Sequence, residues 1–158
     1  MEEITLVSDL IRLCKNVSVY GELITLVELS KNQNYKQIIW LGGSRHLYDI
    51  ECDGKRIEVK SCNVNNDWAE RERRKDPSFE SGFDHINPRK LDYVVCVCFT
   101  KDFQGAKFYV FTSEEVKMFE KSNFGRSFET YVIEIRKHND DRRNTLIKNS
   151  LDAWDKIQ

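Results

Sequence analysis

The stretch YDIECDGKRIEVKS, residues 48–61, places four acidic side chains among apolar ones and has a lysine near its end. The Asp-Gly pair at positions 53–54 is a preferred two-residue turn between antiparallel strands, so the stretch predicts a hairpin. In that hairpin Asp49 lies opposite Glu58, and Lys60 follows on the same face. Like charges directly opposite each other destabilise a hairpin, whereas two converging carboxylates are ligands that Mg²⁺ prefers. The pattern therefore predicts a divalent-cation site with a lysine beside it.

A site of this kind has the components that hydrolysis of a phosphodiester requires. A cation held by carboxylates stabilises negative charge on the phosphoryl oxygens and on the leaving oxygen. Lys60 is a compact positive charge within reach of that cation, which suits water activation or charge stabilisation. A neighbouring cation lowers the pKa of a lysine, and this would favour the first role. The alternative is a solvated acidic face on an edge hairpin, with Lys60 as a surface partner of either acid.

The opposite face of the hairpin is apolar and must pack against elements that the rest of the chain provides. Periodicity and turn residues predict helices and strands that alternate along the chain. The expected helices are residues 8–16, 19–32, 68–75, 114–121 and 141–157, and the expected strands outside the hairpin are residues 35–41, 91–100, 107–111 and 128–137. This order predicts an α/β fold with a central mixed β-sheet flanked by helices.

Three of these elements rest on specific patterns. The sequence LDYVVCVCFT, residues 91–100, is an almost unbroken apolar run, which predicts a strand buried on both faces. Thr112 and Glu115 form a capping-box pattern at the start of helix 114–121. Apolar residues in the tail recur at helical spacing and predict a helix that docks on the domain. These residues are Leu146, Ile147, Leu151, Trp154 and Ile157.

Length and composition limit the organisation of the chain. Its 158 residues are the size of one domain, and a net charge of −1 gives no whole-protein field that attracts a polyanion. Any nucleic-acid surface must therefore come from local clusters of basic residues. The acidic start MEEITLV and the lack of a long apolar run predict a cytoplasmic protein, or a nuclear one in a eukaryote, with no membrane partner.

The cysteines predict reduced thiols, because their number is five and they include no close pair of the metal-binding type. Cys96 and Cys98 point the same way on a strand, so a zinc site shared with Cys52 or Cys62 is the alternative. We favour the interpretation that these side chains are small buried apolar groups.

The spacing of Asp49 and the tripeptide EVK at 58–60, after a helix that carries Glu22, resembles the PD-(D/E)xK nuclease superfamily. The resemblance covers approximately residues 18–112 in the family's order of helix, three-stranded meander, helix and strand. Tyr48 stands where the family motif has proline. The resemblance implies the restriction-endonuclease-like fold with an αβββαβ core.

The same resemblance implies a single nuclease domain over residues 1–158. Its core would be approximately residues 18–112, and a C-terminal strand and helix, approximately residues 128–157, would pack on that core. The segment from 66 to 90 leaves directly from the strand with the EVK tripeptide, so we expect it to contain the recognition surface.

The resemblance also implies a role for each residue of the motif. Asp49 and Glu58 would hold Mg²⁺, for which Mn²⁺ would substitute, and the backbone carbonyl of Val59 would be a further ligand. Lys60 would orient or help to deprotonate the attacking water. Glu22 would be the family's helical acid, a ligand of a second ion or of a metal-bound water. Its place on the helix predicts that it faces the sheet.

The implied activity is Mg²⁺-dependent hydrolysis of DNA by a restriction-type endonuclease. Such an enzyme would act as a homodimer, in which each subunit cuts one strand of a two-fold symmetric site. The alternatives are a structure-specific nuclease, such as a Holliday junction resolvase, and a non-catalytic relative that binds nucleic acid.

Basic residues at two places are candidates for DNA contacts. Ser44 and Arg45 belong to a glycine-rich turn that would let the backbone approach DNA, although they fit an ordinary turn equally well. Arg71, Arg73 and Arg74 lie on the predicted helix 68–75, where a solvated helix face is the alternative and the one we favour.

Overall fold

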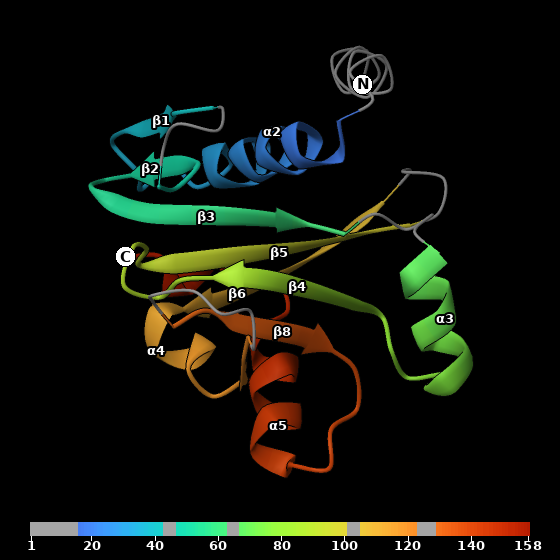
Figure 1. Cartoon of the computed structure of the whole chain (residues 1–158). Coiled ribbons are helices and arrows are strands. Elements are labelled where there is room, and N and C mark those ends of the chain that lie inside the picture. Colours follow the sequence, from blue (N-terminus) through green and yellow to red (C-terminus); the bar gives the residue numbers. More distant parts are fainter. Residues whose placement is uncertain (1–15, 43–46, 63–66, 101–104, 123–128) are drawn as a thin grey trace.

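The computed structural model describes residues 16–42, 47–62, 67–100, 105–122 and 129–158 (Figure 1). Most of the predicted helix 8–16 lies outside these residues, and so do Ser44 and Arg45. In chain order the elements are α2 (Val17–Ser30), β1 (Ile38–Trp40), β2 (Ile50–Cys52), β3 (Lys55–Ser61), α3 (Asp67–Lys75), β4 (Ser81–Ile86), β5 (Tyr93–Phe99), β6 (Ala106–Thr112), α4 (Ser113–Val116), β7 (Glu120–Lys121), β8 (Tyr131–Ile135), α5 (Asp141–Ser150) and a final 3₁₀ turn, η1 (Trp154–Lys156).

The expected α/β architecture with a mixed sheet flanked by helices is confirmed. Five strands form a sheet in the order β1-β2-β3-β5-β6, in which β3 and β5 are parallel and the other neighbours are antiparallel. A separate antiparallel sheet has the order β4-β8-β7. Figure 1 shows α2 on one side of the larger sheet and the smaller sheet with α5 on the other.

The two faces of the larger sheet cover different apolar cores. Ile57 and Val59 of β3 belong to the core beneath α2. Because side chains alternate along a strand, Glu58 and Lys60 point to the opposite face, toward the smaller sheet. Lys60 is the register partner of Cys96, which belongs to the second core. Only the first residue of β5 is less than buried, which confirms the prediction of a strand covered on both faces.

The chain departs from the predicted elements in three places. Strand β4 was not predicted, because the polar segment that contains it reads as a surface excursion, yet it pairs with β8 far along the chain. The capping box of Thr112 and Glu115 is confirmed, but α4 is only four residues long. The tail is not one helix, because α5 ends at Ser150 and Asp152 takes a positive φ of 50° before η1.

No helix among the described residues is long and apolar enough to cross a bilayer.

Helix α2 packs against β3 so closely at Gly21 that no side chain fits there. A Cβ atom at Gly21 would lie 1.7 Å from Ser61 Oγ, and that hydroxyl is buried among the described residues without a hydrogen-bond partner. The contact therefore limits how closely α2 can approach β3 at the residue before Glu22.

We expect Gly21→Ala to destabilise the protein, although alanine is the better helix former. Overpacking of this kind costs about 1–3 kcal/mol, which corresponds to a fall in melting temperature of roughly 2–12 °C. The matched control is Gly105→Ala, where the nearest atom to a new Cβ is 3.5 Å away. Thermal denaturation of both variants checks the prediction, and equal melting temperatures would show that the Ser61 hydroxyl rotates away or that α2 moves without cost. Adding Ser61→Ala to Gly21→Ala should restore part of the loss.

Candidate active site

The hairpin that carries the acidic residues has the predicted turn. Asp53 and Gly54 both have positive φ, 47° and 78°, as a type I′ turn requires. The register is also as predicted for three pairs, the last of which joins Ile50 to Ile57. Residues 49 and 58 are not a fourth pair, because the Asp49 amide donates to the Ile57 carbonyl at 3.0 Å. The prediction that Asp49 lies directly opposite Glu58 in the ladder is therefore wrong.

Asp49 instead uses its side chain where the ladder stops. Its Oδ2 accepts a hydrogen bond of 2.7 Å from the amide of Val59. The pairing of β2 with β3 ends at Ile57, whereas β5 pairs with β3 as far as Ser61. Beyond Ile57, therefore, none of the described strands pairs with β3 on the β2 side. A residue in an extended strand points its N–H and C=O to the same side, so the Val59 carbonyl also points to this open edge. The structure therefore brings the Asp49 carboxylate and the Val59 carbonyl to the same edge of β3.

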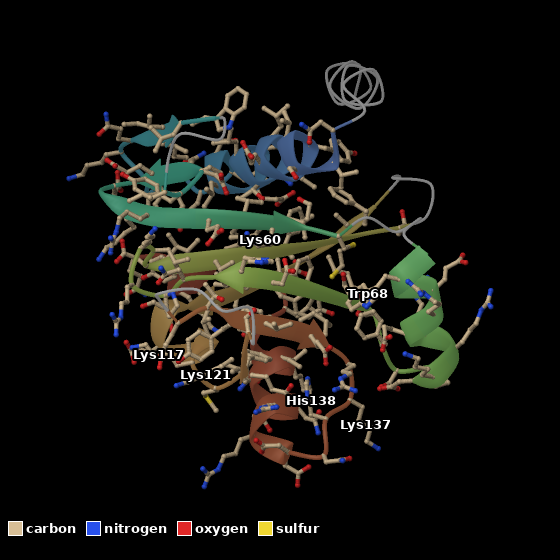
Figure 2. The ribbon with its side chains drawn as sticks, in the orientation of Figure 1. Lys60, Trp68, Lys117, Lys121, Lys137 and His138 are labelled. Carbon is tan, nitrogen blue, oxygen red and sulfur yellow. The ribbon has the colours of Figure 1, made fainter. Side chains whose placement is uncertain are left out.

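Glu58 and Lys60 form an ion pair on the face toward the smaller sheet. Lys60 Nζ lies 2.8 Å from Glu58 Oε1, and both side chains are largely covered, with 27% and 17% exposed. Burial raises the pKa of Glu58, Lys60 lowers it, Asp49 raises it and Lys90 lowers it. Figure 2 shows Lys60 beside the β3 ribbon, on the side of the smaller sheet.

Glu22 approaches the same edge from α2. It is 7% exposed, which confirms the prediction that it faces the sheet and excludes an exposed helical carboxylate. Its Oε2 accepts a hydrogen bond of 2.7 Å from the indole nitrogen of Trp40. Burial raises the pKa of Glu22, the bond from Trp40 lowers it, and the charge of Asp49 raises it. Glu22 and Asp49 are thus close enough for their charges to interact.

Burial also raises the pKa of Asp49, while its bond from Val59 and the charge of Lys60 lower it. The pKa values of Glu22, Asp49 and Glu58 are therefore all raised, and the charge of Asp49 acts on the other two. Buried negative charge of this kind is stabilised by a cation. Oxygen donors from carboxylates and a backbone carbonyl are the ligands that Mg²⁺ takes. The donor set thus fits the ion that the motif implies.

The protein does not by itself form a complete ligand cage at this place. Within the described ranges, no group of three His, Cys, Asp or Glu residues is arranged to hold a metal ion. Mg²⁺ usually binds through one or two carboxylates and keeps several waters or substrate phosphate oxygens. The arrangement of Asp49, Glu58 and the Val59 carbonyl is compatible with such an open site, with Glu22 beyond them.

The basic residues predicted to bind DNA are placed only in part. Arg71, Arg73 and Arg74 do lie on a helix, α3, at the edge of the molecule (Figure 1). Arg71 and Arg74 are exposed and Arg73 is half-buried. Ser44 and Arg45 lie outside the described residues, so the glycine-rich turn stays a prediction.

Sequence reasoning missed two residues near the carboxylates. Trp40 reads as a packing residue, but the pairing of β1 with β2 places it opposite Ile50 and beside Asp49. Lys90 lies on a turn at the end of β4, where Asn87 accepts hydrogen bonds from the amides of Arg89 and Lys90. The β-branched strand pattern before Trp40 could have indicated its partner strand, whereas no local signal connects Lys90 with Glu58.

The zinc alternative has no support among the described residues, where no three His, Cys, Asp or Glu side chains are arranged to hold a metal ion. Cys52 lies in the core beneath α2, whereas Cys62, Cys96 and Cys98 lie in the core on the other face of the sheet. All four are buried free thiols. A hydrogen bond from Cys98, with others from Ser81 and the backbone, lowers the pKa of Cys62 to about 6 against the opposing effect of burial.

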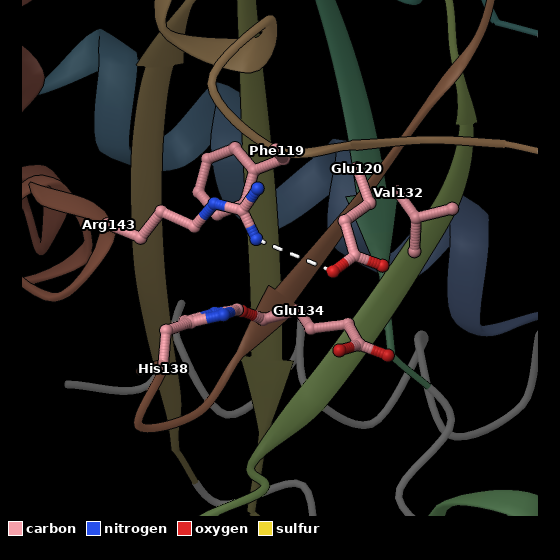
Figure 3. Close-up of a pocket in the computed structure, with 6 residues that line it drawn as sticks. All are labelled: Phe119, Glu120, Val132, Glu134, His138 and Arg143. Carbon is pink, nitrogen blue, oxygen red and sulfur yellow. Dashed lines mark hydrogen bonds and ion pairs between the residues drawn. The ribbon is translucent and has the colours of Figure 1, made fainter. Parts of the chain in front are cut away.

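A shallow pocket between β7, β8 and α5 lies apart from these groups and contains none of the predicted site residues. It is lined by Phe119, Glu120, Val132, Glu134, His138 and Arg143 (Figure 3). Its polar groups are engaged within the protein, since His138 Nε2 lies 2.9 Å from the carbonyl of Glu134 and Arg143 contacts Glu120 at 3.5 Å. The pocket therefore adds no second candidate for chemistry.

The chain matches no model of a known protein family and no curated protein. The candidate site is therefore defined by the geometry of Glu22, Asp49, Glu58 and Lys60 alone.

Proposed function

We propose that this protein is a Mg²⁺-dependent endonuclease that hydrolyses phosphodiester bonds in DNA, with a core of the PD-(D/E)xK type. The observation that carries the proposal is that the charge of Asp49 acts on both Glu22 and Glu58, and that burial raises the pKa values of all three carboxylates, while Lys60 is paired to Glu58 at 2.8 Å. The element order supports it, because α2, β1, β2, β3, α3 and β5 follow one another as in the family core, with β4 inserted into the smaller sheet.

The metal would be held by Asp49, Glu58 and the carbonyl of Val59, with Glu22 as ligand of a second ion or of a bound water. When bound, it would supply Lewis-acid stabilisation of the negative charge on the phosphate. Lys60, as an ammonium, would orient the attacking water and stabilise the negative charge that develops on it. Because Lys60 is fixed by its ion pair with Glu58, its ammonium stays next to the metal site before substrate arrives.

The proposed substrate is duplex DNA, and the proposed active species is a homodimer. Two-fold symmetry would place one carboxylate edge at each strand of a symmetric site. Contacts with the phosphate backbone would come from Arg71, Arg73 and Arg74 on α3 and from Ser44 and Arg45.

A plasmid-cleavage assay tests the activity directly. We expect purified protein to convert supercoiled plasmid with Mg²⁺ or Mn²⁺, and to leave it unchanged in EDTA. Discrete fragments would indicate a sequence-specific enzyme, and a smear would indicate a nonspecific one. Cleavage of four-way junctions but not of duplex would indicate a resolvase. Binding of DNA without cleavage of any of these substrates would identify a non-catalytic relative and overturn the proposal.

A further inference from the structure

We propose that Trp40 is a positioning residue for Glu22: it holds one carboxylate oxygen so that the other is presented to the metal site. This inference rests on the proposed function. The hydrogen bond from the indole nitrogen reaches Oε2 of Glu22 at 2.7 Å, which leaves Oε1 as the oxygen without that restraint. Glu22 is 7% exposed, whereas Trp40 is 45% exposed, so the ring lies at the surface with its N–H directed inward.

The backbone around Trp40 is tied to the candidate metal ligands. Trp40 is the register partner of Ile50, and the next residue, Leu41, donates its amide to the Asp49 carbonyl at 2.9 Å. A shift of β1 would therefore move the Asp49 backbone and the indole together. Helix α2 also contacts β1, so Glu22 and its donor belong to two elements that pack directly on each other.

Gly42 restrains the indole from the other side. It has a positive φ of 48°, and a Cβ atom built on it would lie 3.1 Å from Cε2, 3.2 Å from Cζ2 and 3.4 Å from Nε1 of Trp40. The backbone at Gly42 thus packs over the edge of the ring that carries the N–H. A side chain at this position would be strained in the left-handed region and would push the donor away from Glu22.

The arrangement is what a carboxylate near a metal requires. A glutamate has several rotatable bonds, and a fixed hydrogen bond to one oxygen orients the other. Partners of this kind behind metal-ligating groups typically change metal affinity or activity by about 10–100-fold when they are removed. The charge of Asp49 opposes that of Glu22, so the indole N–H also keeps Glu22 in place against repulsion.

Trp40→Phe removes the donor and keeps an aromatic ring. The measured quantity is the Mn²⁺ midpoint, the Mn²⁺ concentration that produces half of the full metal-induced rise in melting temperature. We expect this midpoint to increase by about tenfold in Trp40→Phe. Gly42→Ala should change it in the same direction. The matched control is Trp68→Phe, because Trp68 is 39% exposed and packs edge-on against Phe79 with ring centroids 5.4 Å apart. Its midpoint should equal that of the wild type.

A double variant separates positioning from a general effect on the fold. In a Glu22→Gln background, Trp40→Phe should produce little further change in the Mn²⁺ midpoint, because the group on which it acts has been altered. A purely structural tryptophan would lower the melting temperature without metal and leave the midpoint unchanged.

Two results would overturn the inference alone, provided that the wild type responds to metal. One is an unchanged midpoint in Trp40→Phe, and the other is a fully additive shift of the midpoint in the double variant. A wild-type protein with no thermal response to Mn²⁺ or Mg²⁺ would overturn the proposed metal site itself, and the inference with it. The two failures are therefore distinguishable in one set of titrations.

Discussion

Lys60→Ala is expected to lower the rate of plasmid cleavage by roughly 10²–10⁴-fold, the range that a positioned proton-transfer group contributes. The ammonium lies 2.8 Å from Glu58, and the substitution removes this positive charge from the candidate site. Glu58→Ala should have an effect at least as large, because it removes a metal ligand together with the partner of Lys60. Initial rates with Mg²⁺ at saturating plasmid measure both effects.

The control for a general loss of positive charge is Lys121→Ala. Lys121 forms a similar ion pair, 2.7 Å from Glu129, but on β7 and away from the carboxylates. Its activity should equal that of the wild type. Circular dichroism of Lys60→Ala should show an intact fold, because the side chain is not part of either apolar core. Wild-type activity in a pure, folded Lys60→Ala protein would remove Lys60 from the mechanism.

A divalent ion is expected to stabilise the native protein strongly. Burial raises the pKa values of Glu22, Asp49 and Glu58, so their charged forms destabilise the fold at neutral pH when no cation is bound. At a hundredfold excess over Kd, binding contributes about 2.7 kcal/mol, which corresponds to a rise in melting temperature of roughly 5–11 °C. Differential scanning fluorimetry in EDTA, Mg²⁺ and Mn²⁺ measures this rise.

The pH dependence of that rise has a definite sign. A carboxylate whose pKa is higher in the folded protein binds its proton more tightly when folded. Its destabilising effect is absent below its unfolded pKa of about 4 and grows as the pH rises through the folded value. Metal competes with these protons, so the metal-induced rise should be larger at pH 7.5 than at pH 5. A rise that grows on acidification would show that other groups bind the ion.

Asp49→Asn separates the charge of this residue from its hydrogen bond. In the wild type the Val59 amide donates to Asp49 at 2.7 Å, and the side-chain oxygen of asparagine can still accept this bond. The substitution removes the negative charge of Asp49, which repels the other carboxylates. In EDTA the variant should melt at the same temperature as the wild type or higher. It should lose most of the metal-induced rise, and it should be inactive.

The opposite result would assign Asp49 a structural role. If Asp49→Asn melts much lower in EDTA, and metal still raises its melting temperature as in the wild type, the carboxylate serves mainly to bind the Val59 amide. The edge of β3 would then not be a metal site. The two outcomes differ in both quantities, so melting curves of the wild type and the variant, each in EDTA and with metal, decide between them.

Much of the local structure could be predicted from the sequence. An Asp-Gly pair between alternating residues specifies the hairpin and its first three pairs, because the turn sets the register within a few residues. The apolar run at 91–100 specifies a buried strand, and the pattern around Thr112 specifies a cap. The periodicity of the helix with Glu22 specifies which of its faces is buried. Each of these depends on neighbours in the chain.

The tertiary structure decided the features that depend on distant partners. Strand β4 exists because β8 pairs with it, and the tail helix stops at Ser150 although its apolar spacing continues. Neither feature can be recognised from adjacent residues in the sequence. Strand β4 depends on its partner strand. The end of the helix depends on the contact of the tail with β6, where the Asp152 amide donates to the Phe108 carbonyl at 2.7 Å.

The same distinction holds for the candidate site. The sequence by itself indicated the candidate residues Asp49, Glu58 and Lys60, because their types and their spacing on a hairpin can be recognised from neighbours in the chain. Only the tertiary structure decided how they meet: Asp49 leaves the ladder to bind the Val59 amide, and Trp40 binds Glu22 across two elements. The physical reason is that residue types and periodicity are local properties, whereas a hydrogen bond between a helix and an edge strand exists only after both have packed.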